Sequence, residues 1–328
     1  MRHVPRFALF LKVLPAVVVS LIAEPAHTQG LTLSCSSGTG VMYGMAKEFA
    51  LNSGFAISEL DWAIQPLVFV QNTLDLRALG GLHASVAVRT GLPMYSGQMT
   101  DSDWLNYQAN GDTSKTNFSQ SDCFTERAVL VDVAAGWEFP VGAGFSVEPF
   151  LAFGYMSWEW SARDGYTQYP AGFPLSSAPY APWSPSQTKD PVYGTGILYS
   201  QTWLIPAAGV RFGFRLGDAW HVSLAVSASP YVFCLDQDDH IFNNVEYTDS
   251  MGGGWMVEPE LTAEVQLTER VLLSAGASYR HITRVIGDDV AMTSGSGSNG
   301  GGSRATYANG GGASFDALSA RLTLSVEF

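Results

Sequence analysis

Large apolar side chains alternate with small or polar ones along most of this chain, and a period of two is typical of β-strands. In residues 220–227 the even positions carry Trp, Val, Leu and Val, whereas the odd positions carry His, Ser, Ala and Ser. The same alternation runs through 145–153, 273–280 and 321–328, where the chain ends on Phe328. One face of such a strand suits lipid and the other suits a polar interior.

Ten segments of this kind are predicted, each long enough for the roughly 9–11 residues that a tilted strand needs to cross a bilayer. They lie at 41–51, 56–71, 80–95, 123–138, 144–160, 198–216, 219–235, 253–267, 270–286 and 313–328. Short turns near 79–81, 140–143, 216–218 and 267–269 alternate with long polar segments at 96–122, 161–197, 236–252 and 287–312. The pattern predicts an all-β fold: a single ten-stranded antiparallel transmembrane β-barrel with short periplasmic turns and long extracellular loops.

The composition agrees with a membrane barrel. Of the 328 residues, 46% are hydrophobic and only 14% are charged, against about 25% in soluble domains. Beyond the N-terminus no run of about 18 apolar residues occurs, which excludes spanning helices. Seventeen Lys and Arg against thirty Asp and Glu give a net charge of −13, the wrong sign for binding nucleic acid.

Residues 1–28 are predicted to form a secretory signal peptide, with Arg2 and Arg6 before an apolar stretch at 7–23 and a polar exit. The alternative is a retained anchor helix, which is disfavoured because Lys12 would lie inside the bilayer. Residues 29–328 are then one domain, the outer-membrane barrel. Removal of the leader makes the mature chain still more acidic.

The remaining composition offers little other chemistry. Cys35, Cys123 and Cys234 are too few and too scattered for a disulfide framework, and they form no metal-ligand spacing with His. No metal and no cofactor is therefore predicted. The glycine runs at 252–254 and 310–312 lack the rest of a phosphate-binding motif and are predicted to be flexible loop ends.

Two acidic clusters stand out because the chain carries so little charge. Side chains two apart on an extended segment point the same way, so Asp101 and Asp103 share one side, as do Asp236, Asp238 and His240. His titrates near neutral pH and a carboxylate can orient it, while two close carboxylates can keep one proton for an oxyanion. The residues alone leave a solvated acidic surface or a weak Ca²⁺ site open as the alternative.

Six short motifs occur in this order along the mature chain: ISELDW at 57–62, DSDW at 101–104, GW at 136–137, AFGY at 152–155, ARDGY at 162–166 and DQDDH at 236–240. Together they resemble the omptin family of bacterial outer-membrane aspartate/histidine proteases. The resemblance implies that an aspartate pair, Asp101 and Asp103, faces a dyad of Asp238 and His240 across a cleft at the extracellular rim. A water molecule between them would attack the peptide bond, with His240 as general base and Asp238 orienting it.

The resemblance also implies cleavage next to basic residues, with Glu48 and Asp236 as acidic walls of the pocket for a P1 Arg or Lys. Asn117 stands where relatives that prefer a basic P1′ residue carry an acid, so we expect weak P1′ discrimination. Ser119 resembles a family serine near the cleft and is interpreted as a bystander. Glu159 occupies a position where a basic residue that binds lipopolysaccharide is expected.

The predicted partners follow from these expectations. They are peptides or proteins with basic residues and outer-membrane lipid, without nucleic acid, for a monomer in the bacterial outer membrane whose site faces outside. Dependence on lipopolysaccharide or another outer-leaflet lipid stays open because of Glu159. The competing function is a non-catalytic barrel, an adhesin or a small porin. A wide channel is disfavoured because side chains largely fill barrels this narrow.

Overall fold

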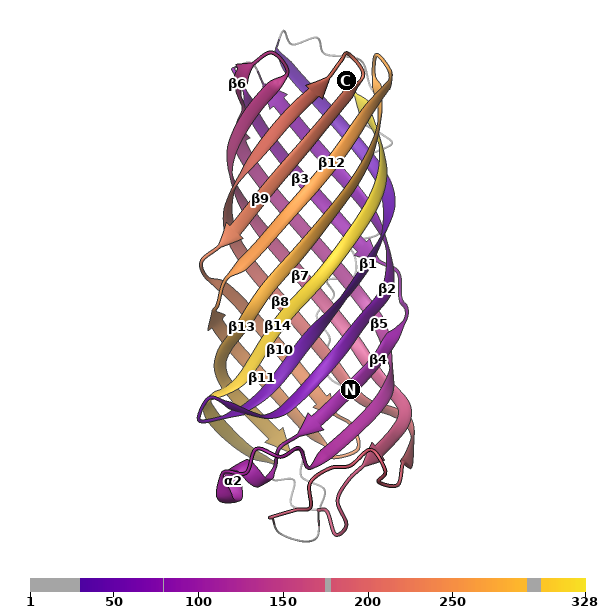
Figure 1. Cartoon of the computed structure of the whole chain (residues 1–328), viewed down its shortest axis with the longest axis vertical. Coiled ribbons are helices and arrows are strands. Elements are labelled where there is room, and N and C mark those ends of the chain that lie inside the picture. The colour runs from indigo at the N-terminus through magenta and orange to yellow at the C-terminus, as the bar shows by residue number, and fades with distance from the viewer. Residues whose placement is uncertain (1–29, 79, 175–177, 294–301) are drawn as a thin grey trace.

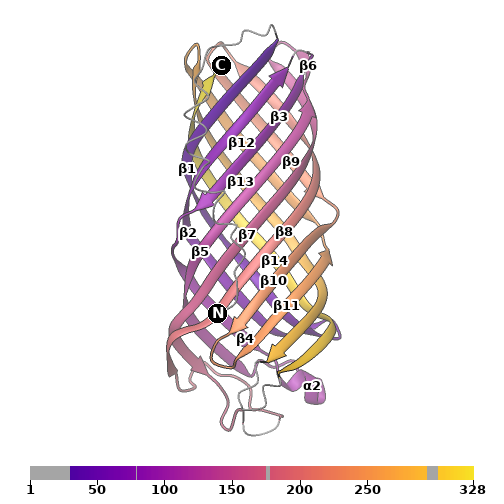
Figure 2. The same cartoon turned by 180° about the vertical axis from the view of Figure 1, so that it is seen from behind.

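The chain forms a long barrel of tilted antiparallel strands, seen from two sides in Figure 1 and Figure 2. The structure is a computed structural model, and it describes residues 30–78, 80–174, 178–293 and 302–328. The predicted signal peptide, 1–28, lies outside these residues. No helix in the described ranges is long and apolar enough to cross a membrane.

Ten strands make up the ring in the described part of the chain. Seven are continuous: β1 (Leu31–Asn52), β2 (Phe55–Ala78), β5 (Asn117–Trp137), β7 (Phe145–Gln168), β8 (Asp190–Leu216), β13 (Val271–Thr293) and β14 (Ser303–Glu327). Three are each divided in two: β3 (Leu82–Gly91) with β4 (Met94–Asp103), β9 (Trp220–Ser229) with β10 (Val232–His240), and β11 (Val245–Gly253) with β12 (Met256–Thr268). Pairing of β1 with β14 closes the barrel, so no long strand edge is left open.

The three divisions occur where the sequence interrupts the ladder. Pro93 lies between β3 and β4, and Pro230 lies between β9 and β10; a proline cannot donate its backbone nitrogen to a neighbouring strand. Gly254, between β11 and β12, has a positive φ of 61°. Two small elements complete the fold, namely β6 (Phe139–Gly142) beside a turn and helix α2 (Asn106–Asn110) at the opposite end of the barrel (Figure 1).

The predicted fold class and the count of ten strands are confirmed, but the predicted strand ends were wrong. Strands reach well into the segments that were predicted as loops; β8 begins at Asp190 and β13 continues to Thr293. The glycines at 310–312 are buried within β14 and are not loop ends. Beyond the membrane both faces of a strand can be polar, so the alternation fades while the hydrogen-bonded ladder continues.

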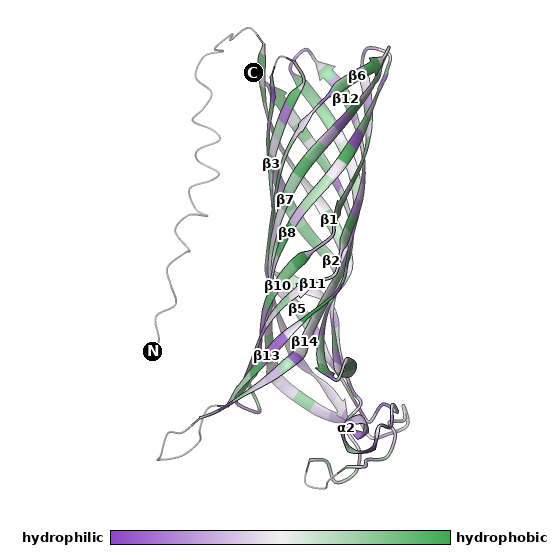
Figure 3. Ribbon diagram, turned by 90° about the vertical axis from the view of Figure 1, so that its left-hand side faces the viewer, coloured by the Kyte–Doolittle hydropathy of each residue, from purple (hydrophilic) through white to green (hydrophobic). Residues whose placement is uncertain are grey.

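An apolar band surrounds the part of the barrel farther from α2. Outward-facing Leu318, Leu322, Leu324 and Val326 of β14 are between about a third and a half exposed. Exposed aromatic side chains border the band on both sides: Trp137, Phe139, Phe214, Trp220 and Phe328 near one end, and Tyr43, Tyr95, Tyr231, Trp255 and Tyr279 towards α2. Such girdles mark the two membrane interfaces of outer-membrane barrels. Figure 3 shows hydrophobic and hydrophilic residues following each other along these strands.

Strand segments on the α2 side of this band extend beyond the membrane. Just past Tyr43, Lys47 lies on the outer surface and forms ion pairs with Glu59 at 2.6 Å and Asp61 at 2.8 Å. On β7 the outward positions likewise change, towards the α2 end, from apolar residues such as Phe153 to charged residues such as Glu159. The α2 end carries the longer connections and corresponds to the predicted extracellular end.

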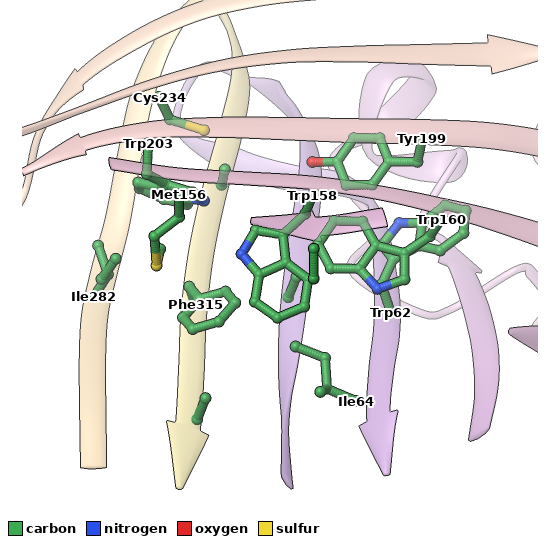
Figure 4. Packing of buried hydrophobic residues seen from close by; sticks show 14 of the residues in the cluster. Trp62, Ile64, Met156, Trp158, Trp160, Tyr199, Trp203, Cys234, Ile282 and Phe315 are labelled. Atoms are coloured by element: carbon green, nitrogen blue, oxygen red, sulfur yellow. The ribbon is translucent and has the colours of Figure 1, made fainter. Parts of the chain in front are cut away.

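A layer of large apolar side chains fills the middle of the lumen (Figure 4). This aromatic layer consists of Trp62, Trp158, Trp160, Tyr199, Trp203 and Phe315, each at most 2% exposed. The rings of Trp158 and Trp160 stack with their centroids 5.2 Å apart. Along β7 the two lie between Ala152, which lines a polar cavity of about 240 Å³, and Ala162, which lines a cleft at the α2 end. The layer therefore separates that cavity from the cleft.

Below the layer, the charged side chains inside the barrel are paired. Arg280 contacts Asp132 at 2.8 Å and Glu258 at 2.6 Å, and Arg211 contacts Glu148 at 2.8 Å. A buried charge is tolerated when an opposite charge and hydrogen bonds accompany it. The lower lumen is thus polar but electrically compensated, in contrast to the cleft above.

Candidate active site

The cleft above the aromatic layer has a volume of about 560 Å³ and lies at the α2 end of the barrel. Five of the six predicted site residues line it: Glu48, Asp101, Asp103, Asp238 and His240. The sixth, Asp236, is 5% exposed and does not line the cleft. The structure therefore brings together residues from β1, β4 and β10. Glu48 lies on a strand as predicted, whereas the site residues of β4 and β10 lie on strands where loops were expected.

Asp101 and Asp103 face the cleft from β4, two residues apart. Their neighbours in register on β5 are Ser119 and Asn117, and the Ser58 hydroxyl on β2 donates a hydrogen bond of 3.3 Å to Asp101 Oδ1. Burial and the charge of Asp103 raise the pKa of Asp101 well above its usual range. Burial also raises the pKa of Asp103, to about 6. The pair is therefore able to hold a proton near neutral pH.

His240 and Asp238 face the same cleft from β10. The two-residue spacing lets His240 Nε2 and Asp238 Oδ2 lie 2.6 Å apart, with Asp238 only 2% exposed beneath the ring. Burial opposes the charged imidazolium, but Asp238, Asp101 and Asp103 together raise the pKa of His240 to about 9. The charge of His240 in turn offsets part of the rise in the pKa of both aspartates, so the aspartate pair and the dyad interact across the cleft.

The two predicted pocket acids lie close to the dyad and to each other. Glu48 is 8% exposed, and burial together with Asp238 and Asp236 raises its pKa well above the usual range. Asp236 accepts a hydrogen bond of 2.9 Å from the Tyr199 hydroxyl at the edge of the aromatic layer. Burial raises the pKa of Asp236 to about 8 despite that bond.

Two further acidic residues of the cleft, Asp249 and Asp289, were missed by the sequence analysis. Asp249 on β11 is the register partner of both Asp236 on β10 and Asp289 on β13. Burial and the charges of Asp236 and Asp289 raise the pKa of Asp249 to about 10. Both residues fell in segments assigned to loops. The alternation of Tyr247, Asp249 and Met251 could have indicated a strand with these three side chains on its inner face.

The acids of the cleft have little positive charge near them. Among the described residues that line it, none is Lys or Arg, and His240 is the one basic group. Within the same ranges, no group of three or more His, Cys, Asp or Glu side chains has the arrangement of a metal site. The cleft is therefore rich in acids that have no paired cation, and it is suited to a cationic ligand.

Three other positions that the sequence analysis compared with the family lie as follows. Asn117 is 1% exposed beside Asp103, and Ser119 lines the cleft beside Asp101. Glu159 lies on the outer surface of β7, where it pairs with Arg127 of β5 at 2.6 Å.

Comparisons with known proteins agree with the fold and identify the family. The profile of the omptin family matches residues 29–328. A plasminogen activator of Yersinia pestis is 20% identical over 259 residues, covering 76% of this chain and 75% of that protein. The crystal structure of the outer-membrane protease OmpT from Escherichia coli is similar with a TM-score of 0.79 and 16% identity, over 93% of this chain and 100% of that chain.

Proposed function

The chain belongs to the omptin family of bacterial outer-membrane proteases, whose active site faces outside the cell, and we propose that it cleaves peptide bonds next to basic residues. The observation that carries this proposal is the cleft in which Asp101 and Asp103 lie opposite the hydrogen-bonded pair of Asp238 and His240. Titratable groups whose pKa values are raised and that converge in one cleft are typical of a catalytic site.

In the proposed reaction a water molecule attacks the carbonyl carbon of the substrate. Neutral His240 removes one proton from the water as the new C–O bond forms, and the carboxylate of Asp238 stabilises the resulting imidazolium. The carbonyl oxygen becomes an oxyanion, which the proton held by Asp101 and Asp103 stabilises. His240 then gives its proton to the leaving amine as the C–N bond breaks, which regenerates the starting charges.

The proposed specificity at P1 rests on Glu48 and Asp236. A guanidinium or ammonium group placed between them would neutralise two buried carboxylates that repel each other and their acidic neighbours. The Tyr199 hydroxyl holds Asp236 in place from the aromatic layer. Charge-assisted hydrogen bonds of this kind are roughly twice as strong as neutral ones.

If His240 is the general base, His240→Ala should lower kcat by at least about two orders of magnitude, the scale of general-base catalysis. Ser119→Ala is the matched control because Ser119 faces the same cleft but takes no part in the proposed proton transfers. The assay is cleavage of a fluorogenic peptide with Arg at P1 by the refolded barrel, with and without lipopolysaccharide. Loss of activity in Ser119→Ala, with His240→Ala still active, would indicate a serine-dependent enzyme instead.

The pH dependence of kcat/KM should also show that His240 is the general base. Because only neutral His240 can accept a proton, and its acidic neighbours raise its pKa to about 9, kcat/KM should still be rising with pH above the unperturbed value near 6.5. Asp238→Asn removes the carboxylate that raises this pKa most, so the acid limb of the profile should move to lower pH while kcat falls. An acid limb that does not move in Asp238→Asn would contradict the assigned dyad.

Discrimination should be strong at P1 and weak at P1′, where Asn117 supplies no charge. Leaving a buried charge without its partner costs about 3–5 kcal/mol, whereas a neutral hydrogen bond contributes about 0.5–1.5 kcal/mol. Changing P1 Arg to Ala should therefore lower kcat/KM by about 100-fold or more, and the same change at P1′ by about tenfold or less. Glu48→Gln or Asp236→Asn should reduce the difference between the effects of the P1 change and the P1′ change on kcat/KM. Equal sensitivity at the two positions would show that the pocket is misassigned.

A further inference from the structure

A chain of hydrogen bonds runs along β8 and ends on Asp236. The indole Nε1 of Trp203 lies 3.1 Å from Gln201 Oε1, and Gln201 Nε2 lies 2.7 Å from the Tyr199 hydroxyl. That hydroxyl lies 2.9 Å from Asp236 Oδ2. All four side chains are at most 5% exposed. The three on β8 share one face because they are two residues apart, and Asp236 on β10 is the register partner of Gln201.

The chemistry of its neighbours fixes which way the Gln201 amide points. An indole N–H can only donate, so the amide atom that faces Trp203 is the oxygen. A backbone carbonyl can only accept, and the carbonyl oxygen of Lys47 lies 3.2 Å from Gln201 Nε2. The amide nitrogen therefore donates to Tyr199, which directs the proton of the Tyr199 hydroxyl to Asp236.

Gln201 also joins two walls of the barrel that do not pair with each other. It lies on β8, whereas Lys47 lies on β1, and these two strands are not neighbours in the sheet. Lys47 directly precedes Glu48. One amide is thus tied to Asp236 through Tyr199 and to the backbone beside Glu48. Gln201 itself does not line the cleft.

We propose that Gln201 and Tyr199 are positioning residues for selectivity at P1, which hold Asp236 and Glu48 in place and direct a hydrogen-bond donor at the Asp236 carboxylate. The proposal rests on the proposed function, since it assumes that these two acids bind the P1 cation. Neither positioning residue touches the substrate. Trp203 contributes by keeping the Gln201 amide in the required orientation.

The donor matters because other acids surround Asp236. Burial raises the pKa of Asp236 to about 8, and the Tyr199 hydrogen bond offsets part of this rise. The titratable groups around Asp236 are Asp238 on its own strand, Asp249 on β11, Asp289 on β13, Glu48 on β1 and the thiol of Cys234. Without the hydroxyl, Asp236 would hold its proton more tightly, and a P1 cation would have to displace that proton at a greater cost.

The test measures P1 selectivity, defined as the ratio of kcat/KM for a peptide with Arg at P1 to that for the same peptide with Ala. Tyr199→Phe should lower this ratio at pH 7 by about tenfold or more, the scale of a hydrogen bond to a charged group. Gln201→Met should lower it too. The double variant should lower it by less than the product of the two single effects, because Gln201 acts partly through Tyr199.

Trp158→Phe is the matched control. Trp158 belongs to the same aromatic layer, and within the described chain its indole nitrogen is buried without a hydrogen-bond partner. The substitution therefore reduces the packing of the layer without breaking a hydrogen bond, and it should leave the ratio unchanged. Correct folding of each variant is checked by heat-modifiable migration in detergent. Gln201→Asn, whose amide is one methylene shorter, takes the place of Gln201→Met if the latter does not fold.

The pH dependence of the ratio separates positioning from general damage to the structure. The loss in Tyr199→Phe should shrink as the pH rises well above 8, because Asp236 then ionises without help from the hydroxyl. Ionisation of His240 cancels in the ratio because both peptides use the same base. An unchanged ratio in Tyr199→Phe at pH 7, a loss that is equal at every pH, or an equal loss in Trp158→Phe would overturn the proposal. So would single effects that multiply in the double variant.

Cleavage of the P1-Arg peptide by wild type, lost in His240→Ala, upholds the proposed function whatever the ratios are. If wild type cleaves no peptide, the proposed function fails, and the positioning role is judged by binding. A P1-Arg peptide with a reduced P1–P1′ bond should then bind wild type more tightly than Tyr199→Phe at pH 7, and the difference should shrink at higher pH. Equal affinities, or no binding to wild type, would overturn the positioning role.

Discussion

Buried carboxylates without compensating cations are the constraint on which the outer half of this barrel depends. Below the aromatic layer each of the interior acids described above contacts an arginine, and the lumen is electrically balanced. Above it, Glu48 and Asp249 line the cleft with Asp236 beside them, and His240 is the one basic group in the described lining. Burial and mutual repulsion raise the pKa values of these three acids. The site is therefore suited to bind positive charge.

The barrel holds this unfavourable arrangement because hydrogen-bonded strands position it. Asp238 and His240 share a face through the two-residue repeat of β10, and register aligns Asp236, Asp249 and Asp289 across three strands. The aromatic layer beneath is closely packed, and the hydroxyl of its Tyr199 donates a hydrogen bond to Asp236. Strands that extend beyond the membrane thus do the positioning that loops perform in many other folds.

The sequence predicted the features that depend on local pattern. Alternation and turn spacing predicted ten strands, and the two-residue spacing of Asp101 with Asp103 and of Asp238 with His240 placed each pair on one face. Asp249 and Asp289 were missed because only the pairing of β10, β11 and β13 brings them beside Asp236. The local sequence pattern does not specify which strands pair. The glycines at 310–312 were misread for the same reason, since their role is to leave room for side chains of other strands.

Proton release on binding tests the central claim most directly. If the acids of the cleft hold protons because no cation is near, a non-cleavable peptide with Arg at P1 should displace some of them at pH 7. Calorimetric titration in buffers of different ionisation enthalpy measures the number of protons released. The account predicts net release, reduced in Asp236→Asn. Binding with no proton release, or with proton uptake, would show that the carboxylates are already ionised and would contradict it.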